Sequence, residues 1–96
     1  MADTGGALRG TAELINEVGL HARPSVKFTQ LAKSFQSTVE FALGADGPWI
    51  DAKSPVKVMR ARAPRGTVLH FAVRGPDAEA ALAAMQALVA AGFGEA

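Results

Sequence analysis

The chain has 96 residues, of which 49% are hydrophobic and 20% charged, and this composition indicates a globular domain rather than a disordered tail or a fibrous repeat. It contains no cysteine, which excludes disulfide bonds and thiolate metal sites. The net charge of +1 gives no general attraction to nucleic acid, and the small size favours a shallow surface site over a deep substrate cleft.

The beginning of the chain predicts a flexible segment over residues 1–9, which are small, polar and interrupted by glycine. A single domain is expected over residues 10–96. The first six residues lack the basic region and the apolar run of a secretory signal, and no apolar segment is long enough to cross a bilayer. We therefore expect a cytoplasmic protein without membrane insertion.

A first strand is predicted over Thr11–Ile15, followed by a polar loop that contains Gly19. Apolar residues then follow the spacing of an amphipathic helix: Phe28, Leu31, Ala32 and Phe35. Pro24 belongs in the first turn of this helix, where its missing N–H would have had no intrahelical partner. This places His21 at or just before the N-terminus of the helix.

A β-hairpin is predicted next. Residues 38–43 alternate, so that one face carries Val39, Phe41 and Leu43. A glycine-rich turn over residues 44–47 precedes a short returning strand over residues 49–51.

A short second helix is expected to begin with Ser54 as N-cap and Pro55 as its first residue. It would carry Val56 and Met59 inward, and residues 64–66 would end it. From Lys53 onward every charge in this region is positive: Lys53, Lys57, Arg60, Arg62 and Arg65. Such a run suggests a basic face for an acidic partner, although a solvated helix and loop would account for it equally well.

The remaining segments complete the order β-α-β-β-α-β-α. A strand over residues 67–74 is predicted to bury Leu69, Phe71 and Val73. A last helix over residues 78–91 would have Asp77 as its cap, Gly92 past its end, and a stripe made of Ala78, Leu82, Met85 and Val89. The order predicts an α+β two-layer sandwich with helices on one face of a sheet.

His21 is the candidate reactive residue. At a helix N-terminus it would lie beside unpaired backbone N–H groups and the positive end of the helix dipole, where anions are favoured. A neutral imidazole nitrogen can attack phosphorus, and Arg23 could hold the phosphate oxygens. Gly19 would let the backbone turn closely, and Leu20 could anchor the loop on the core. The alternatives are a histidine that only caps the helix and a surface arginine with a solvated head group.

Four motifs together resemble the HPr family, the histidine-containing phosphocarriers of the bacterial phosphoenolpyruvate-dependent sugar phosphotransferase system. They are Gly19–Pro24, Ala52–Ser54, Ala63–Thr67 and Gly92–Glu95, and the resemblance spans about residues 10–95. It implies an open-faced β-sandwich in which three helices cover one face of a four-stranded antiparallel sheet. It also implies a carrier rather than an enzyme, with no cofactor or metal. A small carrier that docks with two partners in turn needs an exposed, reusable face, so we expect a monomer with transient interfaces.

The resemblance further implies that His21 accepts a phosphoryl group on Nδ1 from enzyme I and passes it to enzyme IIA components for sugar uptake. Arg23 would stabilise the phosphoryl group, which would lie in a loop formed by Gly19, Leu20, Ala22 and Pro24. Ser54 occupies the place of the family's regulatory serine, the target of an HPr kinase/phosphorylase, although capping alone explains a serine there. The expected partner-docking residues are Leu20, Pro55, Val56, Lys57 and Met59.

The sequence departs from the family pattern at Pro55, Lys57, Arg60 and Arg62, which puts partner choice in question. A regulatory phosphocarrier of a nitrogen-related branch, or one whose binding to a kinase or transcription factor is controlled at Ser54, would share the chemistry of His21 without serving sugar transport. An autonomous enzyme is disfavoured, because the chain offers no carboxylate pair, metal-ligand cluster or nucleotide-binding loop. No interleaved basic and aromatic pattern predicts nucleic-acid binding.

Overall fold

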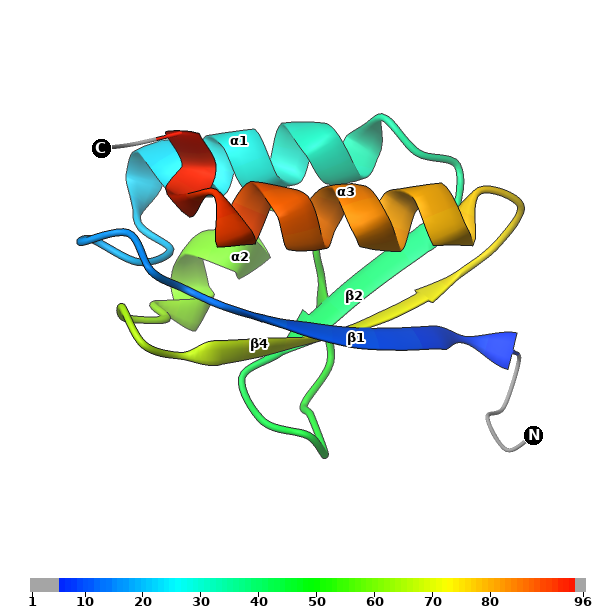
Figure 1. Cartoon of the computed structure of the whole chain (residues 1–96), viewed down its shortest axis with the longest axis horizontal. Helices are drawn as coiled ribbons and strands as arrows, with labels where there is room; N and C mark the ends of the chain where they lie inside the picture. The colour runs from blue at the N-terminus through cyan, green and yellow to red at the C-terminus, as the bar shows by residue number, and fades with distance from the viewer. Residues whose placement is uncertain (1–5, 95–96) are drawn as a thin grey trace.

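The computed structural model describes residues 6–94, which form a four-stranded sheet with three helices on one face (Figure 1). The elements are β1 (Leu8–Glu13), α1 (Ala22–Lys33), β2 (Thr38–Ala42), β3 (Ile50–Asp51), α2 (Pro55–Ala61), β4 (Val68–Arg74), α3 (Ala78–Ala90) and the 3₁₀ turn η2 (Gly92–Gly94). The predicted α+β class and element order are confirmed. Within the described range no helix is both long and apolar enough to span a membrane.

The strands lie in the order β1-β4-β2-β3, and every neighbouring pair is antiparallel. In the middle of the sheet, Phe71 of β4 is paired with Gly10 of β1 on one side and with Phe41 of β2 on the other. Phe41 is also paired with Ile50 of β3, which confirms the predicted hairpin. Because β4 separates β1 from β2, the chain between those two strands crosses over the sheet, and α1 makes that crossing.

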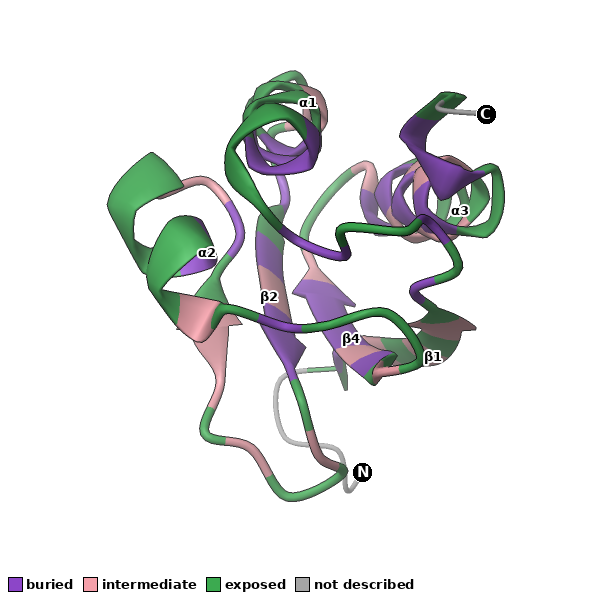
Figure 2. Cartoon of the chain, turned by 90° about the vertical axis from the view of Figure 1, so that its left-hand side faces the viewer, coloured by how far each residue is buried: buried purple, intermediate pink, exposed green. Residues whose placement is uncertain are grey.

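The core lies between the sheet and the helices, whose buried sides face each other in Figure 2. Phe28 of α1 is fully buried at its centre. Its ring lies edge-on to Phe41 with centroids 5.0 Å apart, and its centroid is 6.1 Å from that of Phe71. Phe93 of η2 completes the cluster at 6.4 Å, so the end of the described chain packs on α1. Such aromatic contacts add to the gain from apolar burial.

The first strand begins earlier than predicted. β1 starts at Leu8 rather than at Thr11, so Leu8 and Arg9 belong to the strand and not to a flexible segment. The inward side of β1 is formed by the half-buried residues Leu8, Gly10 and Ala12. Because Gly10 and Ala12 are small, they give only a weak hydrophobic alternation in the sequence. Residues 1–5 of the predicted segment lie outside the described residues.

Three apolar residues predicted to face the core are exposed instead. Leu43 is 38% exposed, because β2 ends at Ala42 and the chain turns away. On α2, Val56 is 59% and Met59 47% exposed, whereas Val58 is fully buried. A helix of seven residues with apolar side chains on two faces does not define its buried face by periodicity.

The two ends of α2 differ in how well they were predicted. Its start is confirmed, since Ser54 is the N-cap, accepts a hydrogen bond from the Lys57 N–H at 3.3 Å, and is followed by Pro55. Its end is not at residues 64–66 but at Ala61. There Arg62 adopts the left-handed conformation with φ +48° and donates its N–H to the Met59 carbonyl at 3.3 Å.

On α3 the predicted buried stripe is confirmed at Ala78, Met85 and Val89. Leu82 is only half-buried, and the fully buried Ala81 lies on the core side in its place. Gly92 follows the end of the helix with φ +63°, as predicted.

Asp77 precedes α3 as predicted, but its side chain makes no hydrogen bond to that helix. Its carboxylate instead accepts three hydrogen bonds from the loop between α1 and β2. The donors are the Gln36 N–H at 3.0 Å, the Ser37 N–H at 2.9 Å and the Ser37 hydroxyl at 2.5 Å. Asp77 therefore joins that loop to the start of α3. The Ser37 hydroxyl, followed by the Gln36 N–H, lowers the pKa of Asp77 below its ordinary value of 3.8.

Because the folded-state pKa of Asp77 is lowered, ionisation of this group stabilises the fold above pH 3.8, and the contribution is lost as the pH falls through the folded value. We expect Asp77→Asn to have a lower free energy of unfolding than the wild type at pH 7. The difference should narrow as the pH falls below 3.8. Urea unfolding between pH 7 and about pH 3 measures it.

Glu79→Gln is the matched control. It removes a carboxylate from the first turn of the same helix, and that carboxylate makes no hydrogen bond to residues 36 and 37. A gap between Asp77→Asn and the wild type that stayed constant over this pH range would contradict the role assigned to Asp77.

Candidate functional site

His21 is the N-cap residue of α1, as predicted, and its backbone is extended with φ −112° and ψ −166°. Its side chain makes no capping hydrogen bond, and within residues 6–94 the ring has no hydrogen-bond partner at all. The side chain is exposed. The alternative in which the imidazole serves only to cap the helix is therefore not the arrangement in this structure.

Two backbone N–H groups beside His21 have no partner in the described chain. The Ser25 N–H donates to the His21 carbonyl at 2.8 Å, and Pro24 has no N–H to donate. The first-turn donors that remain are the N–H groups of Ala22 and Arg23, neither of which makes a backbone hydrogen bond. They point outward from the N-terminus of a 12-residue helix, which is a favourable place for an anion.

The loop before His21 is held by main-chain contacts with the loop between α2 and β4. Gly19 has φ +63°, and a Cβ atom there would lie 2.3 Å from the Ala63 carbonyl oxygen. The same oxygen accepts a hydrogen bond from the Leu20 N–H at 2.9 Å. Leu20 is buried among the core residues and anchors the loop, as expected. Only glycine allows the two loops to come this close.

Asn16 closes the same loop from within, and sequence reasoning missed it. Its buried amide donates from Nδ2 to the Gly19 carbonyl at 2.9 Å, while the Gly19 N–H donates to the Asn16 carbonyl at 3.1 Å. Asparagine commonly supports turns through such local bonds. An asparagine directly after a predicted strand and three residues before a glycine was the available signal.

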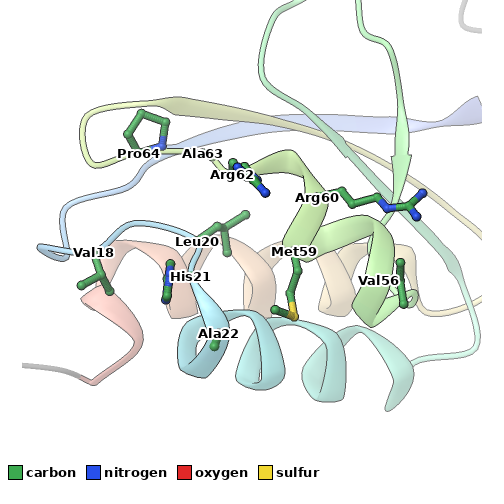
Figure 3. A pocket seen from close by; sticks show the side chains of 10 residues that line it. All are labelled: Val18, Leu20, His21, Ala22, Val56, Met59, Arg60, Arg62, Ala63 and Pro64. Atoms are coloured by element: carbon green, nitrogen blue, oxygen red, sulfur yellow. The ribbon is translucent and has the colours of Figure 1, made fainter.

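His21 borders two hollows in the surface. The first has a volume of about 730 Å³ and is lined by Val18, Leu20, His21, Ala22, Val56, Met59, Arg60, Arg62, Ala63 and Pro64 (Figure 3). The second has a volume of about 690 Å³ and is lined by Val18, His21, Ala22, Arg23, Pro24, Lys27 and Gly94. The ring thus lies on the ridge where an apolar hollow with two arginines meets a hollow with two further cations.

The second hollow brings together residues that are distant in sequence. Lys27 of α1 donates from Nζ to the Phe93 carbonyl at 2.7 Å, which ties η2 to the helix that carries Arg23. Lys27 lies one helical turn after Arg23, a spacing of four residues that places both side chains on one face of α1. The sequence alone did not indicate the contact of Lys27 with Phe93, because it joins residues 66 positions apart. Nowhere in residues 6–94 do three histidine, aspartate or glutamate side chains converge as a metal site would require.

The expected docking residues do not all lie together. Val56 and Met59 line the first hollow and are exposed, and Leu20 lines it although it is almost fully buried. Pro55 and Lys57 are exposed on α2 but do not line the hollow. Ser54 likewise lies outside both hollows, half-buried at the N-cap of α2.

Comparison with known proteins decides the family. The family described as "PTS HPr component phosphorylation site" matches residues 8–91. The chain belongs to the HPr family. Phosphocarrier protein HPr of Cupriavidus necator is similar to it, with 42% identity over 88 residues that make up 92% of this chain and 97% of that protein. Phosphocarrier protein NPr of Escherichia coli is 32% identical with the same two coverages.

A solved structure agrees with this assignment. HPr-C-His from Thermoanaerobacter tengcongensis superposes with a TM-score of 0.84 at 34% identity, covering 93% of this chain and 98% of that one. The resemblance drawn from the sequence motifs and the open-faced four-stranded fold are both confirmed. The chain is a phosphocarrier of the HPr type.

The contact between Gly19 and Ala63 yields a stability prediction. Gly19→Ala places a side chain at positive φ and forces a Cβ atom against the Ala63 carbonyl, so the two loops must separate. We expect a loss of about 2–4 kcal/mol in the free energy of unfolding, measured with urea.

Gly92→Ala is the matched control. Its φ is also +63°, but the added Cβ would meet its nearest atom at an ordinary 3.6 Å. This variant should lose only about 1 kcal/mol, the cost of the left-handed conformation alone. Equal losses in the two variants would show that the close approach at Gly19 carries no energetic weight.

Proposed function

We propose that His21 accepts a phosphoryl group from enzyme I and passes it to acceptor proteins, with enzyme IIA components of sugar uptake as the main acceptors. The observation that carries this proposal is the exposed imidazole of His21, without a hydrogen-bond partner in the described chain, beside the two unpartnered N–H groups of Ala22 and Arg23. In the transfer a ring nitrogen forms a bond to phosphorus while the bond from phosphorus to the donor breaks. The HPr pattern assigns that nitrogen as Nδ1.

Charge around the ring supports a bound phosphoryl dianion. Arg23 and Lys27 both line the hollow on one side of His21, and no acidic residue lines it. The N-terminal end of α1 adds the positive end of a helix dipole. Together these groups would stabilise the phosphorylated ring without holding it so deeply that a second protein could not reach it. Both hollows are open at the surface, as a carrier requires.

We propose that the partner proteins supply the groups that complete each transfer. Val56 and Met59 offer exposed apolar surface beside the ring for such a partner, with Arg60 nearby. We further propose that the chain acts as a cytoplasmic monomer that meets donor and acceptor in turn. Transient partners of this kind use small interfaces.

The similarity to NPr keeps a regulatory branch as the second candidate. In that branch the chemistry at His21 would be unchanged, and only the acceptor would differ. The higher identity to HPr of Cupriavidus necator favours the first candidate. Transfer of phosphate from the phosphorylated chain to a sugar-specific enzyme IIA distinguishes the two.

Ser54 is proposed as a regulatory site for an HPr kinase/phosphorylase. Its hydroxyl is half-buried and accepts the Lys57 N–H, so modification would replace a cap bond by a dianion at the start of α2. The added charge would also reduce the positive charge of the face that includes Lys57. Pro55 removes an N–H from the backbone that such a kinase would recognise.

The phosphorylation of His21 is tested by intact mass before and after acid treatment. The wild type, incubated with phosphoenolpyruvate and enzyme I, should gain one phosphate that acid removes. His21→Ala should gain none, whereas His70→Gln, which changes the other histidine of the chain, should behave as the wild type. Acid-labile phosphate on His21→Ala would refute the assignment. Phosphate on Ser54 would instead survive acid and be absent from Ser54→Ala.

Arg23 is expected to speed the transfer by holding the phosphoryl oxygens. Arg23→Ala should lower kcat/KM for transfer from enzyme I by about 10-fold or more, because hydrogen bonds between charged groups are worth about 1.5–3 kcal/mol. Rapid-quench measurement of phosphorylated chain gives the rate. Lys33→Ala, at the opposite end of the same helix, is the control and should transfer at the wild-type rate. Wild-type kinetics in Arg23→Ala would rule out a phosphate-binding role.

A further inference from the structure

Arg62 stands in a backbone conformation that its side chain disfavours. It is the C-cap of α2 with φ +48° and ψ +41°, in the left-handed region that glycine occupies most easily. Only one other non-glycine residue in the described range, Phe93, has a positive φ, and it is buried in the aromatic cluster, where packing of its ring holds it in place. Arg62 is exposed, so no such burial explains its presence.

The side chain of Arg62 has no partner of its own. It makes no hydrogen bond or ion pair in residues 6–94, where the recorded ion pair joins Arg74 to Glu40 at 3.6 Å. It lines the first hollow, to which no acidic residue contributes. In Figure 3 it lies between Met59 and Pro64, while the side chain of Arg60 is directed away from His21. Arg62 is thus an unpaired cation in the hollow that His21 borders.

The backbone at Arg62 is also connected to the loop that holds His21. The next residue is Ala63, whose carbonyl accepts the Leu20 N–H and lies against Gly19. The backbone of Arg62 is therefore held next to the loop that carries His21, by its own N–H bond to Met59 on one side and by the contacts of Ala63 on the other. A strained residue that is exposed, unpaired and held beside a reactive group is the arrangement expected of a residue kept for recognition.

We propose that Arg62 is a specificity-determining residue that pairs with a carboxylate of the donor protein, enzyme I. The occupant of the first hollow would be a segment of that partner in which an acidic side chain meets Arg62 and an apolar one meets Val56 and Met59. The charge of the hollow and its exposed apolar walls both fit this segment. The inference rests on the proposed function, because it concerns the partner that delivers the phosphoryl group to His21.

This role predicts that Arg62→Gly raises the stability of the fold but lowers the rate of phosphoryl transfer. Arg62→Gly removes both the charge and the strained side chain. Its folding equilibrium constant should rise about fivefold, as measured by urea unfolding, because glycine adopts this conformation without strain. Its kcat/KM for phosphoryl transfer from enzyme I should fall about 10-fold at low salt, and the difference from the wild type should shrink at about 0.3 M salt, where charge pairs are screened.

Arg62→Lys and Lys33→Ala are the controls. Arg62→Lys keeps the charge at the strained position and should retain most of the transfer rate. Lys33→Ala removes a cation of the described chain that lies outside both hollows, at the end of α1, and should show no salt-dependent loss. If the role of Arg62 were purely structural, Arg62→Gly would have a lower kcat/KM for phosphoryl transfer only if this variant were also less stable than the wild type.

The outcomes separate the two proposals. Transfer to Arg62→Gly at the wild-type rate with the wild-type salt dependence overturns the role of Arg62 and leaves the proposed function intact. A loss that Arg62→Lys shares in full, or one that salt does not diminish, overturns charge recognition as its cause. Failure of enzyme I to phosphorylate the wild type itself overturns the proposed function, and the inference falls with it.

Discussion

The close approach of Gly19 to the Ala63 carbonyl is the contact on which the rest of the site depends. It joins the loop after β1 to the loop before β4, and the Leu20 N–H shares the same oxygen at 2.9 Å. α1 begins immediately beyond this point, so the contact sets where the helix starts and which N–H groups remain unpaired. The exposed imidazole of His21 therefore belongs to a rigid frame although it lies on the surface. A reactive group placed on a rigid frame needs little reorganisation when a partner arrives.

The elements of the fold follow from local signals in the sequence. Alternation places Phe41 and Phe71 on the inner face of the sheet, and Ser54 followed by Pro55 marks the start of α2. Each of these signals is contained within a few neighbouring residues. The faces of α2 were predicted wrongly because two helical turns carry Val56, Val58 and Met59, and only the packed structure selects which of them is buried.

The site was predictable only in part. The position of His21 at the head of a helix could be inferred from Pro24 and from the spacing of apolar residues behind it. The contact between Lys27 and Phe93 could not be inferred, because the packing of α1, α3 and η2 brings these two distant residues together. The left-handed backbone of Arg62 was equally hidden, since an arginine gives no sequence signal for positive φ. Long-range packing supplies what local pattern cannot.

The position of His21 between the two hollows determines whether donor and acceptor proteins can bind at the same time. Two hollows share one imidazole, and Val18 and Ala22 line both of them. A protein seated over either hollow covers the ring, so under the proposed function donor and acceptor exclude one another and no ternary complex forms. Each cycle then consists of two separate encounters. Between them the phosphorylated and the unphosphorylated protein exist free in solution. Under the proposed function, the ratio of the phosphorylated to the unphosphorylated form depends on how fast the donor adds phosphoryl groups and the acceptors remove them.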